Sequence, residues 1–121
     1  MSSELVFVYN AKSGKLNAML DSMHKVISPA TYSCNLCRIT YGTFTELPEW
    51  RQFREHFHGN MTFLHIDEFE RQYPPAESYP VIYEKEADGT LSTVADTALI
   101  NSMRDIQALI QFCRDWSRLA A

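Results

Sequence analysis

The chain has 121 residues, with 11 Lys and Arg against 15 Asp and Glu, so its formal net charge is −4 at pH 7. It is 45% hydrophobic and 21% charged, the balance expected of a soluble globular protein folded as a single domain over residues 1–121. The charge argues against nucleic acid as a partner, and no apolar run is long enough to cross a membrane. The first residues lack the basic segment of a signal peptide, so we expect a cytoplasmic protein; its oligomeric state stays open.

Strand and helix patterns follow one another in the first half of the chain. Residues 5–9 form a short run of β-branched and aromatic residues, which predicts a buried strand. Apolar residues then recur at helical spacing over 16–27 and again over 45–56, which predicts two amphipathic helices. Residues 31–41, between these helices, are ambiguous between helix and loop.

The second half predicts a strand over 61–66 and a short polar segment over 67–73 that forms one helical turn. A hairpin follows, with strands over 81–85 and 91–95 joined at Asp88-Gly89, a typical hairpin turn. An alternating order of strands and helices favours parallel pairing of the first two strands, with the hairpin added antiparallel. The predicted fold class is therefore α/β.

A last helix is predicted near the C-terminus, capped by Asn101 or Ser102. Cys113 falls in its apolar stripe and is therefore expected in the core. The stripe consists of Met103, Ile106, Leu109, Ile110 and Cys113.

Cys34 and Cys37 form a Cys-x-x-Cys motif, the sharpest chemical signal in the chain. This spacing brings two sulfurs within bridging distance, so the pair could exchange disulfides, with Cys34 attacking and Cys37 resolving. If Ser33 caps a helix, Cys34 lies in its first turn, where a thiolate is stabilised. A helix that starts at Pro29 instead places Cys34 mid-helix and removes that stabilisation. A purely structural pair packed in the core is an alternative.

A metal site is the third interpretation of the motif. Structural zinc takes four sulfur or imidazole ligands, and His24 could join Cys34 and Cys37 across a helical hairpin. Asp21 lies one turn before His24 and could orient its ring. No second Cys-x-x-Cys exists, so the signal for a metal site is weak. We expect no required cofactor, with zinc as the metal that the motif would bind. The other candidate ligands are His56, His58 and His65.

The segment 10–15 ends in Gly14-Lys15, as a phosphate-binding loop does. That loop also needs a glycine at its start and a Ser or Thr after the lysine, and Tyr9 and Leu16 occupy those positions. We therefore expect no specific binding of ATP or GTP.

From residue 61 onwards the sequence resembles the second half of a thioredoxin-like domain. The match rests on the strand before Asp67, on Tyr79-Pro80 at the start of the next strand, on the Asp88-Gly89 turn and on the final helix. The resemblance implies a thioredoxin-like mixed sheet with flanking helices, a cis peptide bond before Pro80, and a protein thiol or disulfide as partner. It also places Pro80 beside the active-site loop, and we expect Tyr79 and Asn10 to contact the substrate with it.

The position of the cysteines departs from that pattern. A thioredoxin-like redox enzyme carries its Cys-x-x-Cys directly after the first strand, where this chain has the cysteine-free segment 10–15. The sequence therefore predicts a helical insertion after the first helix that carries Cys34 and Cys37. The chain also resembles a small bacterial family, a similarity that implies no activity. It rests on Tyr9-Asn10-Ala11, Ser13-Gly14, His24-Lys25, Ser28-Pro29 and Cys34-Asn35-Leu36-Cys37.

Overall fold

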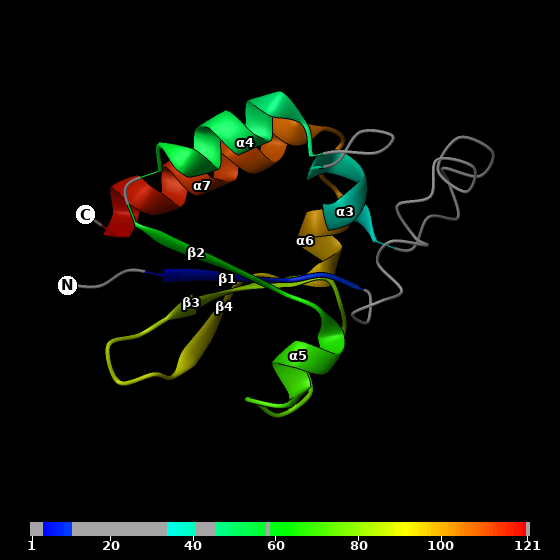
Figure 1. The fold of residues 1–121 in the computed structure, drawn as a ribbon, viewed down its shortest axis with the longest axis vertical. Helices are drawn as coiled ribbons and strands as arrows, with labels where there is room; N and C mark the ends of the chain where they lie inside the picture. The colour runs from blue at the N-terminus through cyan, green and yellow to red at the C-terminus, as the bar shows by residue number, and fades with distance from the viewer. Residues whose placement is uncertain (1–3, 11–33, 41–45, 58, 121) are drawn as a thin grey trace.

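The computed structural model describes residues 4–10, 34–40, 46–57 and 59–120, and these ranges form the predicted α/β fold (Figure 1). Their four-stranded sheet has the order β2-β1-β3-β4. β1 pairs with β2 in parallel and with β3 antiparallel, and β3 pairs with β4 antiparallel. The predicted parallel pair and antiparallel hairpin are thus confirmed. The strands are β1 Glu4–Val8, β2 Asn60–Leu64, β3 Val81–Lys85 and β4 Leu91–Ala95.

Helices lie on both faces of this sheet. α4 and α7 run side by side over one face, and α5 lies against the other (Figure 1). α3 and α6 contact each other near one end of the sheet. The helices are α3 Asn35–Thr40, α4 Pro48–Glu55, α5 Ile66–Glu70, α6 Thr97–Asn101 and α7 Ile106–Ala120. No helix in the described ranges is long and apolar enough to cross a membrane.

The sheet separates two hydrophobic clusters, and β1 contributes to both because successive side chains of a strand point to opposite faces. Leu5 and Phe7 join the cluster beneath α3, α4 and α7, in which Trp50 is fully buried. Val6 and Val8 join the smaller cluster around Phe69 of α5. A strand buried on both faces reads as a continuous apolar run, which is why 5–9 was predictable.

The C-terminal region differs from the prediction in its caps. Asp96 caps α6 by accepting a hydrogen bond from the Leu99 amide at 2.9 Å, and the Asp105 carboxylate accepts one from the Ala108 amide at 3.1 Å. The predicted cap at Asn101 or Ser102 is wrong because the chain is already helical up to Asn101. All five members of the predicted apolar stripe are buried, and four of them lie on α7, whereas Met103 precedes the helix.

Three further predictions concern the segment after β2 and the region before α4. The short polar segment after β2 begins as the five-residue helix α5, in agreement with the single helical turn predicted there. The predicted helix over 16–27 lies outside the described residues, whereas the cysteines of the insertion predicted to follow it lie inside them. Of the ambiguous stretch 31–41, residues 35–40 are helical as α3.

Candidate functional site

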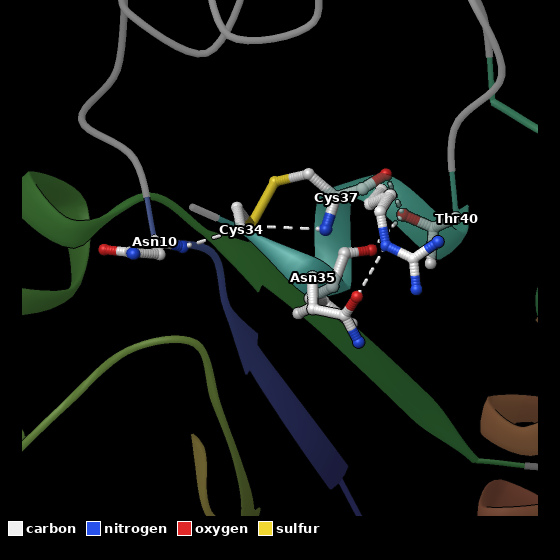
Figure 2. Close-up of a disulfide and its surroundings, with 7 residues drawn as sticks. Asn10, Cys34, Asn35, Cys37 and Thr40 are labelled. Atoms are coloured by element: carbon white, nitrogen blue, oxygen red, sulfur yellow. Dashed lines mark hydrogen bonds between the residues drawn. A yellow bond between two sulfur atoms is a disulfide. The ribbon is translucent and has the colours of Figure 1, made fainter. Parts of the chain in front are cut away.

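Cys34 and Cys37 form a disulfide at the start of α3 (Figure 2). Their Cα atoms are 5.3 Å apart, inside the range that disulfide geometry requires. The predicted proximity of the two sulfurs is therefore confirmed. Both side chains are 0% exposed and belong to the cluster beneath α3, α4 and α7.

The Cys34 sulfur takes the place that a serine or aspartate oxygen takes at a helix start. It accepts hydrogen bonds from the Cys37 amide at 3.2 Å and from the Asn10 amide at 3.4 Å (Figure 2). Cys34 stands directly before α3, so neither the first-turn nor the mid-helix position predicted for it is correct. Ser33, the predicted cap, lies outside the described residues. Two backbone N–H groups therefore point at one sulfur.

The disulfide sits where three strand ends meet. Asn10 follows β1, and the Tyr9 amide donates to the Leu64 carbonyl at the end of β2. Val8 pairs with Val81, which brings Pro80 to the same end of the sheet. The Tyr79–Pro80 bond is cis, as predicted. The structure thus brings Asn10 and the backbone of Pro80 to the end of the sheet that carries the disulfide.

A polar clamp inside the motif fixes α3 to the segment after α6. The Asn35 side-chain amide donates to the Ile100 carbonyl at 2.6 Å and to the Met103 carbonyl at 3.0 Å. Its oxygen accepts a hydrogen bond from Arg38 at 2.7 Å, and Arg38 also donates to the Arg104 carbonyl at 3.2 Å. Asn35 therefore ties the start of α3 to two carbonyls, one within α6 and one just after its end.

We expect Asn35→Ala to lower the free energy of unfolding by about 2 kcal/mol, because it removes two hydrogen bonds to carbonyls and one from Arg38. Urea unfolding measures the change. Asn101→Ala, an exposed asparagine on α6, is the matched control and should change stability by less than about 0.5 kcal/mol. Equal losses of stability in the two variants would show that the hydrogen bonds of Asn35 do not stabilise the fold.

Tyr79, predicted to contact the substrate, has its side chain in the Phe69 cluster on the other side of the sheet. Its hydroxyl donates to a Glu70 carboxylate oxygen at 2.8 Å and accepts from the Ala76 amide at 3.0 Å. Burial raises the pKa of the Tyr79 hydroxyl above its ordinary value. The structure therefore does not bring this hydroxyl to the cysteines, whereas Asn10 lies against Cys34.

The metal hypothesis gains no further ligand from the described part of the chain. His24 lies outside it, and no group of three or more His, Cys, Asp or Glu residues within it is arranged to hold a metal ion. The third cysteine, Cys113, is fully buried in α7, as predicted. Burial raises the pKa of the Cys113 thiol to about 12, which keeps it protonated and unreactive.

His65, predicted only as a candidate metal ligand, pairs with Glu68, and this pairing was not predicted. The Glu68 carboxylate accepts hydrogen bonds from the His65 backbone amide at 2.8 Å and from His65 Nδ1 at 2.6 Å. These bonds lower the pKa of the Glu68 carboxyl. His65 Nε2 is buried without a hydrogen-bond partner among the described residues. The spacing of a capping box, with Glu three residues after the cap, could have revealed the pair.

No family model, curated protein or solved structure matches this chain. The site must therefore be interpreted from its own geometry.

Proposed function

We propose that this protein exchanges disulfides with a protein partner through Cys34 and Cys37, on a thioredoxin-like fold. The observation that carries the proposal is the pair of backbone N–H groups, from Cys37 and Asn10, that point at the Cys34 sulfur. Hydrogen bonds to a sulfur stabilise its anion more than its thiol, and the thiolate is both the nucleophile and the leaving group of the exchange. Cys34 is therefore the attacking sulfur.

The exchange proceeds in two displacements. The Cys34 thiolate attacks one sulfur of the partner disulfide, and the other partner sulfur leaves as a thiolate. The Cys37 sulfur then loses its proton and attacks the Cys34 sulfur, which releases the second partner thiolate. The partner gains two electrons, and the chain ends with the disulfide that the structure contains.

The arrangement of the sheet supports the thioredoxin-like part of the proposal. The cysteines are displaced along the sequence, but in space Cys34 lies directly at the end of β1 through its hydrogen bond from Asn10. Pro80 directly precedes β3, the neighbouring strand, at the same end. The four-stranded mixed sheet, with β1 and β2 parallel and helices on both faces, agrees with the mixed sheet and flanking helices that the resemblance implies.

Burial favours a second candidate function, a binding module in which the disulfide is only structural. Both cysteines are 0% exposed, and a partner sulfur must reach Cys34 to react. Energetics count against this candidate, because a bridge between residues three apart constrains the unfolded chain little. Chain entropy assigns such a short loop about 2 kcal/mol, less than a bridge across a long loop. A disulfide at this spacing therefore adds little to the stability of the fold.

Equilibration in glutathione buffers separates the two candidates. We expect a reduction potential between about −120 and −270 mV, the range of exchange proteins, and reduction of the bond within minutes at neutral pH. The fraction of reduced protein is read by alkylation and mass spectrometry, with Cys113→Ala as the control that removes the third thiol. A potential below about −300 mV would instead establish the structural candidate. About one zinc per chain in the purified reduced protein would establish the metal alternative.

A further inference from the structure

We propose that a groove between α4 and α7 binds a partner protein through an acidic segment that carries one aromatic side chain. This α4–α7 groove lies at the C-terminal ends of the two helices, which run side by side, and measures about 280 Å³ (Figure 1). It is separate from the disulfide, because α4 begins beside α3, where the Leu47 amide donates to the Thr40 carbonyl, and runs away from it. The residues that line the groove are Phe53, His56, Phe57, Arg114, Ser117 and Arg118.

Two aromatic rings form the apolar part of the α4–α7 groove. Phe53 and Phe57 are both half-buried, and their ring centroids are 5.6 Å apart. The buried Trp116 stacks on Phe57 with ring centroids 6.1 Å apart, which holds the Phe57 ring in place. Aromatic side chains offer a large contact area at a small cost in conformational entropy, and they are enriched at protein interfaces. The groove can therefore bury one apolar side chain of a partner.

Two arginines give the α4–α7 groove its charge. Arg114 and Arg118 are four residues apart on α7, so their side chains lie on one face of the helix, one turn apart. The Arg114 guanidinium lies 5.5 Å from the centroid of the Phe53 ring, within cation–π range. Arg118 forms an ion pair with Asp115 at 3.8 Å, but both side chains are largely exposed, so this pair is weak. Both guanidinium groups can therefore donate hydrogen bonds to carboxylates of a partner.

The charge and size of the α4–α7 groove determine the kind of partner that fits it. The chain has a formal net charge of −4, whereas the described residues that line the groove include two arginines and no acidic residue. Such a surface attracts an anionic partner, because complementary charges favour association. Small-molecule sites usually measure about 300–1,000 Å³ and enclose most of the ligand, whereas this groove is smaller and open to solvent. An acidic segment with one aromatic side chain satisfies both the rings and the arginines.

Fluorescence anisotropy with a labelled peptide tests this proposal. The probe has one phenylalanine flanked on each side by two glutamates, and the full-length chain is titrated into it at low salt. We expect saturable binding with a dissociation constant below about 1 mM. The double variant Arg114→Gln, Arg118→Gln should weaken binding about tenfold, because it removes two exposed charge pairs with the probe. Alanine in place of the phenylalanine of the probe should also weaken binding at least about tenfold, because no ring is then buried.

Arg71→Gln is the matched control for the arginine variants. Arg71 is as exposed as Arg118 and also forms a weak ion pair, with Asp67 at 3.7 Å, but it follows α5 on the other face of the sheet. Its replacement should change the affinity for the probe by less than about twofold. Arg118 also lies in the last turn of α7, where a cation stabilises the helix dipole. The double variant should nevertheless keep its unfolding temperature within about 3 °C of the wild-type value, so that the loss of binding is not a loss of fold.

Four results would overturn the proposal. One is the absence of saturable binding to the wild-type chain, and another is equal affinity of the double variant and the wild-type chain for the probe. Phenylacetate binding as tightly as the peptide would instead make the α4–α7 groove a small-molecule site. A dimer of the chain that the double variant abolishes would make a second copy the occupant. The probe contains no cysteine, so these results do not depend on the disulfide exchange proposed above.

Discussion

A Cys37→Ser variant should hold a mixed disulfide at Cys34 that the wild-type chain releases. Cys34 keeps its amide donor from Asn10 in this variant, so it can still attack, but no neighbouring thiol can complete the second displacement. Release then depends on a thiol from solution. An intramolecular group has an effective concentration far above millimolar, so we expect the adduct to persist at least about a hundredfold longer.

Mass spectrometry of the reduced variants, mixed with oxidised glutathione, measures this lifetime. Cys34→Ser is the matched control and should form no lasting adduct, because the Cys37 sulfur is not the one on which the two amides converge. Cys113 should stay unmodified throughout, because its thiol is buried and its pKa is raised to about 12. Equal adducts on Cys34→Ser and Cys37→Ser would contradict the roles assigned to the two sulfurs.

Trp50→Ala should cause the largest loss of stability among single substitutions in the cluster beneath α4. The Trp50 side chain is fully buried, and its ring lies 5.9 Å from Phe7 and 6.3 Å from Phe63, edge to face with both. Removing an indole from such a site leaves a cavity, so we expect the free energy of unfolding to fall by about 3–5 kcal/mol. Urea unfolding at equilibrium measures it.

Trp50→Phe tests the cause of that loss. The indole Nε1 is buried without a hydrogen-bond partner among the described residues, so phenylalanine keeps most ring contacts and removes an unpaired donor. We expect a cost of about 1–2 kcal/mol, less than half that of alanine. Phe53→Ala, a half-buried neighbour on the same helix, should fall between the two. A phenylalanine variant as unstable as the alanine variant would disprove this account.

The strands and their pairing could be predicted because their signals are local. The apolar run over 5–9 marks a strand with both faces covered, and it becomes β1. The Asp88-Gly89 turn places glycine where the backbone adopts a φ of +91°, a conformation that other residues rarely take. Turn chemistry and short apolar runs depend on neighbouring residues only, so they can be recognised in the sequence alone.

The position of the candidate site could not be predicted in the same way. Cys34 contacts Asn10 across 24 residues, and the sequence distance suggested a displaced motif instead. α6 was not predicted because a five-residue helix is too short to show a period, and its cap, Asp96, was not recognised. The His65–Glu68 pair was overlooked because histidine is not among the usual capping residues. These features depend on contacts between distant segments or on residues that are unusual at their positions, and the sequence pattern shows neither.

The central place of β1 in the sheet has a consequence for how the protein folds. Glu4 pairs with Asn60 on one side and with Lys85 on the other, so both neighbours of β1 lie far along the chain. Closing loops of this length lowers the entropy of the chain before any stabilising contact forms, and such topologies fold slowly. β1 is made before either partner, and one face of the strand is covered only after α7, residues Ile106–Ala120, has been synthesised. β1, the strand that ends at the disulfide, is therefore among the last to be paired on both sides. During synthesis its uncovered apolar side chains make it prone to aggregation.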